Sequence, residues 1–477
     1  MEHILNVFWD NDLVGRIIKK PAGLIFQYSE AWIDSKDAFP ISISLPLQKP
    51  PFEETISETF FENLLPESGI KEKIARFYGV SEKNNYAMLD AIGGECAGAL
   101  TVLPENESIP EEGGYEEISI DELSRIIFNP DKKPLLIGRK DIRLSLAGSQ
   151  DKLPVYSKDN KFFLPRGRKA SNYIIKPPID YLQDTVANEA FCMKLAENSG
   201  LLVPSVKIIG NKVNFLLIKR YDRFETETDV KRLHQEDFCQ AMGIYSNQKY
   251  EAEGGPNLVD CFSLIDKNSS QPVLDKNRLL KFVIFNYYIG NADAHAKNLS
   301  FLYDNDRIIL APFYDLISTC VYDNLSKKMA MKIGSENRLE WIRPRHFERL
   351  AKAVDINPRF TLNTLENLGK QLSIAAKTLT DKFKKDSQWK NVLGKIVKVI
   401  EKHQRLLNEQ WQNGVLGRPF RTTILLFVAF LTPLQPLPAS HADLFISYMA
   451  TANFVGKEQD SPVIIFILFL PPLLPAM

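Results

Sequence analysis

The chain has 477 residues, enough for two or three domains, and its 44% hydrophobic and 25% charged content is ordinary for a folded globular protein. Lys plus Arg and Asp plus Glu both number 59, so no net charge directs the whole chain to nucleic acid or to an anionic membrane. This balance leaves room for a local basic patch.

Residues 1–105 contain short apolar or alternating runs separated by turn residues: "ILNVFWD", "LVGRIIK", "GLIFQYS" and "GALTVLP". Such runs predict a small β-rich N-terminal subdomain, and the pattern between them predicts helices near 56–76 and 81–91. The segment 104–117, "PENESIPEEGGYEE", is rich in Pro, Glu and Gly, and we interpret it as a linker.

Residues 106–222 have a mixed pattern. Strands are expected in "DNKFFLPRG", "SNYIIKPP", "SVKIIG" and "VNFLLIKRYDRF". A helix is expected in "DTVANEAFCMKLAENSGL", with Asp184 as its N-cap and Gly200 as its stop. We therefore expect a second, strand-rich domain over 106–222.

Residues 223–417 are dominated by helical periodicity, as in "NRLLKFVIFNYYIGN" and "KNVLGKIVKVIEKHQRLLNEQWQ". A strand-rich lobe followed by a larger helical lobe is the layout of a two-lobed kinase. The predicted fold class is therefore α+β, with a β-rich N-terminal subdomain, a kinase-like small lobe and a mainly helical C-terminal lobe.

Residues 418–477 differ from the rest because they are rich in proline and poor in charge. Two apolar runs there, "ILLFVAFL" and "VIIFILFL", are far shorter than the roughly 20 residues of a membrane-spanning helix. We expect an atypical, poorly ordered tail. Peripheral membrane contact and docking of a partner are the alternatives.

Cysteine usage and the N-terminus point to a cytoplasmic protein. The cysteines form no C-x-x-C pair and no metal-ligand spacing, so we interpret them as reduced, mostly buried thiols. The first residues, "MEHILNVFWDN", lack the basic and apolar segments of a signal peptide.

A dense polar cluster lies in "YYIGNADAHAKNLSFLYDNDRIILAPFYDLIS". Asp293 and Asn298 form D-x-x-x-x-N, and Asp315 follows after the apolar run "IILAPF", which we expect to be a strand. Phosphoryl transfer from ATP needs these residue types in this order: an Asp accepts the hydroxyl proton, and an Asn and a second Asp hold Mg²⁺. The alternative is a polar surface loop with a helix cap.

Two neighbours in this cluster are ambiguous. Lys297 could screen charge or bind phosphate, or it could be an exposed cation. His295 could position the loop or touch the nucleotide, or it could be a buried structural histidine.

A phosphate-binding segment is expected upstream, and "RLSLAGSQDKLPVY" (143–156) is the candidate. It matches neither the Walker A pattern nor G-x-G-x-x-G, but Ala147, Gly148 and Ser149 are small enough for their backbone N–H groups to approach phosphate. Lys152 adds positive charge. By itself the segment is more typical of a turn between strands.

Lys176 ends the apolar run "YIIK", where a lysine that binds ATP phosphates is expected, and Glu189 on the next helix could pair with it. Solvated side chains are the alternative for both residues. The segment 216–222, "LLIKRYD", would join the lobes, and its backbone at 219–221 could bond adenine.

Together these segments resemble the HipA family, serine/threonine-kinase toxins of bacterial toxin–antitoxin pairs, over about residues 1–415. The resemblance rests on "RLSLAGSQDK", "IIKPP", "RLHQEDFCQAMG", "GNADAHAKNLSF" and "PFYDLIS", in the family's order. Family members usually end soon after a helix like "VIEKHQRLLNEQW", so residues 418–477 depart from the pattern.

The resemblance implies a kinase that uses ATP and Mg²⁺. It implies that Asp293 is the catalytic base, that Asn298 and Asp315 bind the metal, and that Ser145 is autophosphorylated and thereby silences the enzyme. By the same resemblance, ATP contacts Ala147, Gly148, Ser149, Gln150, Asp151, Lys152, Lys176, Lys219, Arg220, Tyr221, His295, Ala296, Lys297 and Asn298.

The resemblance also implies partners. The protein substrate would be a translation factor such as an aminoacyl-tRNA synthetase, whose phosphorylation arrests growth. A helix-turn-helix antitoxin of the HipB type would bind the toxin and carry most contact with operator DNA. Two alternatives stay open: a small-molecule phosphotransferase of the same fold, and a non-catalytic repressor component bound to the antitoxin.

Overall fold

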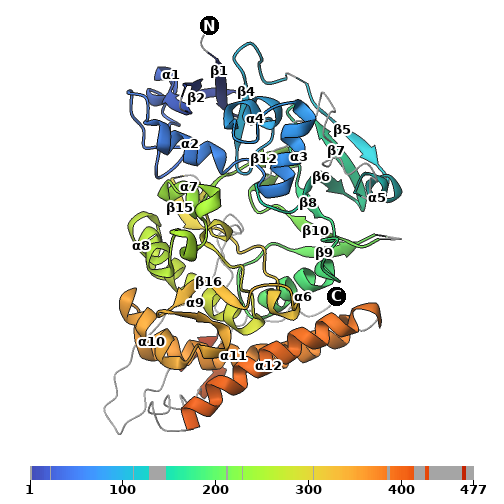
Figure 1. Ribbon diagram of the computed structural model, residues 1–477, viewed down its shortest axis with the longest axis vertical. Coiled ribbons are helices and arrows are strands. Elements are labelled where there is room, and N and C mark those ends of the chain that lie inside the picture. Colours follow the sequence, from blue (N-terminus) through green and yellow to red (C-terminus); the bar gives the residue numbers. More distant parts are fainter. Residues whose placement is uncertain are drawn as a thin grey trace, which may run out of the picture. The chain divides into compact units, whose positions relative to one another are not determined.

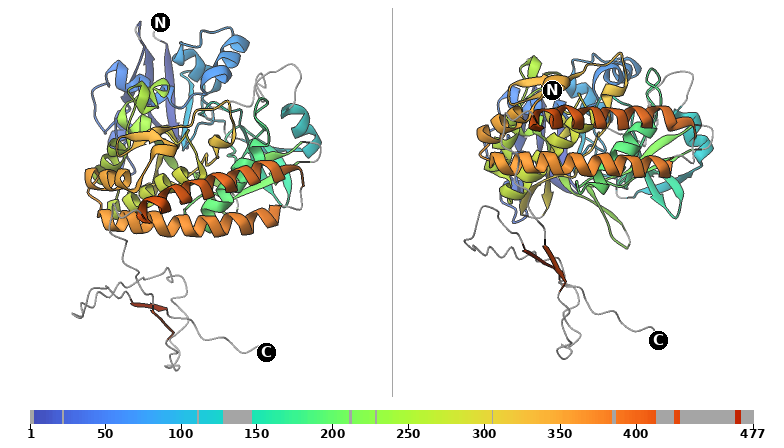
Figure 2. Two further views of the ribbon diagram at one scale, coloured as in Figure 1. Left: turned by 60° about the horizontal axis from the view of Figure 1, so that its bottom comes forward. Right: turned by 90° about the horizontal axis from the view of Figure 1, so that it is seen from below.

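We describe the protein from a computed structural model, drawn in Figures 1 and 2. The described residues are 3–412, without 22, 111, 128–146, 211–212, 228, 305 and 384–386, together with Leu425–Val428 and Ile465–Leu468. The chain divides into two compact units, residues 1–412 and 413–477. In the second unit, β18 (Leu425–Val428) pairs in parallel with β19 (Ile465–Leu468), and the rest of the predicted tail lies outside the described residues.

The N-terminal region, residues 3–104, is an antiparallel sheet of order β3-β2-β1-β4 with its own hydrophobic core. The four strands agree with the four predicted runs, whereas the helix expected over 56–76 is two helices, because Pro66 has no N–H to bond within a helix. The elements are β1 (Ile4–Trp9), β2 (Asp12–Lys19), β3 (Leu24–Tyr28), α1 (Glu30–Ile33), α2 (Glu54–Glu62), α3 (Ser68–Tyr78), α4 (Asn85–Ile92) and β4 (Leu100–Pro104).

A second sheet has six strands in the order β5-β7-β6-β8-β10-β9, and a second core lies against it. Strand β5 begins within the predicted linker, and β6 begins within the segment that could have been only a turn. The elements are β5 (Gly114–Ile118), α5 (Ile120–Ile127), β6 (Leu153–Lys158), β7 (Lys161–Arg166), β8 (Tyr173–Lys176), α6 (Thr185–Asn198), β9 (Val206–Ile209) and β10 (Phe215–Lys219).

The predicted start and stop of α6 are only partly correct. Asp184 does precede the helix, but its φ is 56° and its side chain makes no capping hydrogen bond. Gly200 follows the C-cap Ser199 and has a φ of 78°, a left-handed conformation that glycine adopts without strain.

The remainder of the first unit is mainly helical, and it holds the largest hydrophobic core. It contains more strands than predicted, including a three-stranded sheet of order β13-β14-β15. The elements are β11 (Arg223–Glu225), β12 (Val230–Arg232), β13 (His234–Asp237), α7 (Phe238–Met242), α8 (Leu258–Asn268), α9 (Pro272–Ile289), β14 (Ser300–Asp304), β15 (Arg307–Leu310), β16 (Lys328–Ile333), β17 (Glu336–Arg338), α10 (Pro344–Ala353), α11 (Pro358–Phe383) and α12 (Lys390–Gln412).

Helix α9 runs through this core, and both of its ends follow from the sequence. Pro272 stands in its first turn, where a missing N–H costs nothing, and Gly290 ends it with a φ of 68°. The long helices α11 and α12 lie side by side beneath it (Figure 2). The end of α9 therefore holds the polar segment 291–298 at a fixed place against the core.

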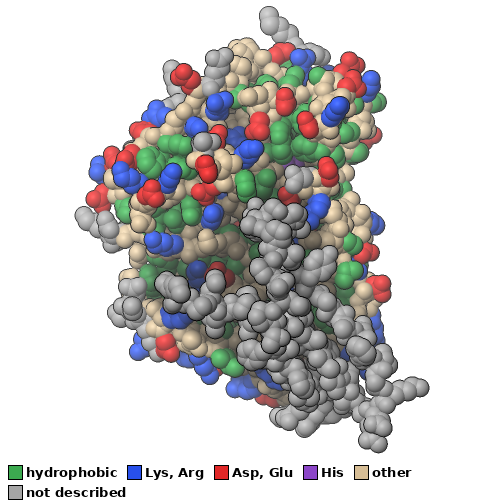
Figure 3. Space-filling view, turned by 180° about the vertical axis from the view of Figure 1, so that it is seen from behind, with side chains coloured by type: hydrophobic (Ala, Val, Ile, Leu, Met, Phe, Trp, Pro, Cys, Tyr) green, Lys and Arg blue, Asp and Glu red, His purple; other side chains and the backbone are tan. Residues whose placement is uncertain are grey.

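Three further observations bear on the sequence predictions. The cysteines are unpaired and, apart from the half-buried Cys320, fully buried, as predicted for reduced thiols. None of the described helices combines the length and the apolar character needed to cross a membrane. Over the coloured part of the face in Figure 3, positive and negative side chains are interspersed. The domain boundaries predicted within the first unit stay predictions.

Candidate active site

A cavity of about 250 Å³ lies within the first unit, and most of the predicted site residues line it. The predicted residues that line it are Ala147, Gly148, Ser149, Gln150, Lys152, Lys176, Glu189, Lys219, Arg220, Tyr221, Asp293, His295, Lys297, Asn298 and Asp315. Asp151 and Ala296 do not line it. Ser145 lies outside the described residues.

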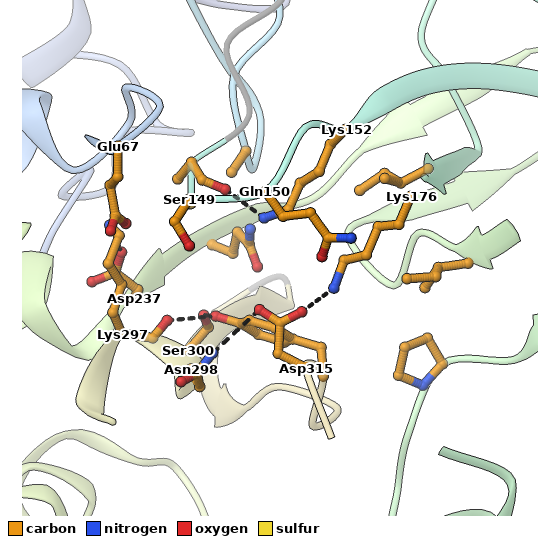
Figure 4. A pocket seen from close by; sticks show the side chains of 18 of the residues that line it. Glu67, Ser149, Gln150, Lys152, Lys176, Asp237, Lys297, Asn298, Ser300 and Asp315 are labelled. Atoms are coloured by element: carbon orange, nitrogen blue, oxygen red, sulfur yellow. Dashed lines mark hydrogen bonds and ion pairs between the residues drawn. The ribbon is translucent and has the colours of Figure 1, made fainter. Parts of the chain in front are cut away.

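Lys176 stands at the end of β8, and its ammonium group lies between two carboxylates. Its Nζ donates to Glu189 Oε1 at 2.7 Å and to Asp315 Oδ1, so neither Lys176 nor Glu189 is a solvated surface residue. Figure 4 shows Lys176 and Asp315 pointing toward each other. Burial alone would lower the pKa of Lys176, but the two carboxylates outweigh it and hold the pKa above its usual range.

Asp315 lies in a loop. The strand predicted in "IILAPF" is shorter than expected, because β15 ends at Leu310. Its φ of 56° is left-handed, a conformation that Asp tolerates better than most side chains and that often marks functional sites. Burial would raise the pKa of Asp315, but Lys176 and Lys152 hold it well below its usual range. The carboxylate is therefore ionised at neutral pH.

Asn298 lies beside Asp315 and completes a pair of oxygen-bearing side chains. Its Nδ2 donates to Asp315 Oδ2 at 3.2 Å, and its Oδ1 accepts from the backbone N–H of His295 at 3.2 Å. An amide and a carboxylate are hard ligands that suit Mg²⁺, which takes its remaining ligands from phosphate and water. Among the described residues there is no group of three or more His, Cys, Asp or Glu side chains placed to hold a metal ion.

Asp293 is exposed at the cavity, five residues before Asn298. Its Oδ1 accepts a hydrogen bond of 2.6 Å from the hydroxyl of Tyr250. Partial loss of hydration raises the pKa of Asp293, and the bond from Tyr250 and the charge of Lys249 lower it. An accessible carboxylate in the same cavity as the Lys176 cluster can accept a proton from a bound hydroxyl.

Both ambiguous neighbours of Asp293 are buried. The Nζ of Lys297 donates to Asp237 Oδ2 at 2.6 Å and to Asn63 Oδ1 at 2.7 Å, so Lys297 is not an exposed cation. Burial lowers the pKa of His295 well below its usual range, so its ring is neutral at neutral pH. Figure 4 shows Lys297 and Asp237 together at one side of the pocket.

The described part of the candidate phosphate segment is anchored at two residues. The backbone N–H of Glu67 donates to the carbonyl of Gly148 at 3.0 Å, and Gln150 Nε2 donates to the carbonyl of Pro177 at 2.7 Å. Lys152 Nζ donates to the carbonyl of Ala147 at 2.6 Å, which closes the segment into a tight turn. The φ of Gly148 is 117°, which favours glycine.

The segment 219–221 offers less free backbone than the sequence suggested. The N–H of Lys219 donates to Ser205, and that of Arg220 to Asn172, both at 2.9 Å. Among the described residues, the structure gives the N–H of Tyr221 no acceptor, so this donor can bond a ligand. The Arg220 side chain is buried in ion pairs with Glu95 and Asp222.

Several cavity residues were not predicted from the sequence. Asn63, Leu64 and Glu67 come from the N-terminal region, and no local motif marks them. Asp237 lies in the quoted segment "RLHQEDFCQAMG", where it caps α7 by accepting from Gln240 N–H, a pattern that reads as a helix start. The other cavity residues not predicted include Gln240, Lys249, Ser300 and Tyr314.

Two family models match the chain. The model described as the HipA-like C-terminal domain matches residues 144–376, and the HipA N-terminal domain matches residues 5–103. The first match includes the Lys176 cluster and the segment 291–298.

Curated relatives and a solved structure agree with these matches. The chain is 42% identical to the Y4mE protein of Sinorhizobium fredii over 373 residues, covering 76% of this chain and 89% of Y4mE. It is 33% identical to the serine/threonine-protein kinase toxin HipA of Shewanella oneidensis over 323 residues, covering 65% of this chain and 73% of that protein. A structure of Shewanella oneidensis HipA with HipB and operator DNA matches with a TM-score of 0.75 and 25% identity, covering 86% of this chain and all of that one.

Proposed function

Because the chain belongs to the HipA family of serine/threonine-protein kinases, we propose that it is the toxin of a toxin–antitoxin pair. It transfers the γ-phosphoryl group of ATP to a serine or threonine of a protein. The observation that carries the proposal is the meeting of Lys176, Asn298 and Asp315 in one cavity that Asp293 also lines.

Asp293 is the general base of this reaction. One of its carboxylate oxygens accepts the proton of the substrate hydroxyl while the hydroxyl oxygen attacks the γ-phosphorus, and ADP leaves with the bridging oxygen and its electron pair. The exposure of Asp293 at the cavity supports this role, because a protein side chain can reach it from solvent.

Lys176 and the segment 147–152 hold the phosphates. Lys176 is kept charged by Glu189 and Asp315, so it can donate to phosphate oxygens without losing its proton. Ala147, Gly148 and Ser149 line the same cavity, where their backbone N–H groups could approach phosphate oxygens, and the free N–H of Tyr221 suits a hydrogen bond to adenine.

Asn298 and Asp315 are the residues that would hold Mg²⁺. When bound, the metal would neutralise charge on the phosphate oxygens. Asn298 directs its amide nitrogen to Asp315, so it must turn its amide over to offer the oxygen as a ligand.

The partner of the toxin is a helix-turn-helix antitoxin of the HipB type, which carries most of the contact with operator DNA. The zero net charge supports this division of labour, and the related Shewanella oneidensis HipA has been solved with HipB and operator DNA. The protein substrate is a translation factor such as an aminoacyl-tRNA synthetase, and its phosphorylation arrests growth.

The proposal is tested with labelled ATP and Mg²⁺ on the purified chain. Wild type should label itself at Ser145, and Asp293→Ala should lower the rate by about 100-fold or more, because the base is lost. Brief expression in cells should arrest growth for wild type alone, and phosphoproteomics of both strains should identify the substrate. Bound ATP without phosphorylation of any protein would instead favour a non-catalytic repressor component.

A further inference from the structure

A segment between α7 and α8, residues 245–254, crosses from the N-terminal region to the helical part of the first unit; it is called the strap below. On one side, Ser246 Oγ donates to Glu62 Oε1 at 2.6 Å, and Lys249 Nζ donates to Glu67 Oε2 at 2.5 Å. On the other side, Glu251 accepts from the backbone N–H and the ammonium of Lys332, at 2.6 and 3.0 Å. The strap is therefore fixed at both ends.

Tyr250 lies between these two anchors, and its side chain reaches Asp293. The hydroxyl donates to Asp293 Oδ1 at 2.6 Å, and the Tyr250 ring packs edge-on against His295 with centroids 5.1 Å apart. Burial and the charge of Asp293 raise the pKa of Tyr250, so the hydroxyl keeps its proton and stays a donor.

This contact leaves the two oxygens of Asp293 unequal. Oδ1 is engaged by Tyr250, while the described residues provide no donor to Oδ2. A carboxylate held at one oxygen can rotate less, so the other oxygen is kept in a more constant direction. Oδ2 is thus the oxygen that can take the proton of an incoming hydroxyl.

We infer that Tyr250 is a positioning residue: the strap holds its hydroxyl on Oδ1 of Asp293 and so orients Oδ2 toward the substrate hydroxyl. The inference rests on the proposed role of Asp293 as general base. The tether of Lys249 to Glu67 makes the N-terminal region part of this arrangement, because that bond fixes the residue next to Tyr250.

The charges around Asp293 give the hydroxyl a second effect. Asp315 and Glu67 disfavour the ionised carboxylate, Lys249 favours it, and the neutral His295 carries no charge. The hydrogen bond from Tyr250 favours the ionised form, so its loss raises the pKa of Asp293.

The test compares Tyr250→Phe with Tyr245→Phe, a matched variant on the same strap whose hydroxyl does not bond Asp293. The rate of self-labelling by ATP and Mg²⁺ should fall about 10- to 100-fold in Tyr250→Phe, as expected for losing a hydrogen bond to a charged group. As the pH is lowered, the variant should also lose activity at a higher pH than wild type does, because the raised pKa of Asp293 causes the base to be protonated sooner. Tyr245→Phe should match wild type, and calorimetry should give both variants an unchanged Kd for ATP.

Equal rates and pH profiles for Tyr250→Phe and wild type would overturn the inference, as would a faster variant, which would mean that Tyr250 blocks the base. If Tyr250→Phe has a lower thermal stability, the same substitution is made in the Asp293→Asn variant to separate a positioning role from a structural one. There, a positioning role predicts no further loss of rate, whereas a structural role predicts the same loss as in wild type. A wild type that binds ATP but labels nothing would overturn the proposed function itself.

Discussion

At the residue scale, the cavity depends on buried charges that neutralise one another. The side chain of Lys176 is 7% exposed, and its two acidic partners, Glu189 and Asp315, lie on other parts of the chain. Burying one charge alone would cost several kcal/mol, so each member of the cluster is tolerated only because the others are present. The sequence shows that a lysine ends β8 and offers Glu189 as its partner, but it does not show that Asp315 is the second carboxylate.

Replacement of this lysine tests that dependence. Lys176→Met should abolish phosphoryl transfer and lower the free energy of unfolding by about 3 kcal/mol, because Glu189 is left buried without a countercharge. Urea denaturation and ATP calorimetry measure the two effects. The control is Lys194→Met on the same helix as Glu189, which breaks only an exposed pair with Glu197 and should change stability by less than about 1 kcal/mol.

At the element scale, the position of the catalytic segment is set by the end of α9. The carbonyl of Gly290 accepts from the N–H of Cys320 at 3.0 Å, and Thr319 Oγ1 accepts from the N–H of Ala292 at 2.7 Å. These bonds tie the segment that carries Asp293 to the one that follows Asp315. A helix terminus thus fixes the separation of two functional groups that are distant in sequence.

Gly290→Ala should therefore harm both stability and catalysis. A Cβ at this position would lie 2.9 Å from Cys320 Cβ and from Val399 Cγ1, and the left-handed backbone adds about 1–2 kcal/mol of strain for any L side chain. Gly79→Ala separates the two costs, because Gly79 ends α3 with the same φ of 68° and has nothing within 4 Å of its Cβ position. If both variants lose equal stability, packing at Gly290 is not the cause.

At the scale of the whole first unit, the N-terminal region is joined to the kinase lobes by buried polar groups. Glu95 and Asp222 receive the guanidinium groups of Arg220 and Arg223 close to the cavity. Glu236 accepts from Ser42 Oγ at 2.5 Å and from Ile43 N–H at 3.0 Å. These contacts make the N-terminal region part of the cavity's support.

Glu236 gives this joint a pH dependence. Burial raises its pKa from the usual range to about 7, so the folded protein binds a proton that the unfolded chain has already released. Stability from this group is present below about pH 4.5 and is lost as the pH rises through 7. The loss amounts to about 3 kcal/mol, from roughly 1.4 kcal/mol for each pH unit of displacement.

Glu236→Gln removes the ionisation while it keeps a side chain of similar size. Urea denaturation between pH 4 and 8 should show wild type losing stability relative to this variant as the pH rises. A constant difference across that range would mean that Glu236 titrates normally. His234 and His403, whose pKa values burial lowers to about 4, change both proteins alike.

The sequence by itself determined the strands of the N-terminal region, the helix after Lys176 and the order of the polar segments, because periodicity, turn residues and short motifs are local properties. Only the tertiary structure decided that Asn63 and Glu67 line the cavity, that Tyr250 reaches Asp293 and that the guanidinium of Arg220 pairs with Glu95 and Asp222. Those contacts join residues far apart in the chain, and their energies depend on burial and on neighbouring charge, which no local stretch of sequence specifies.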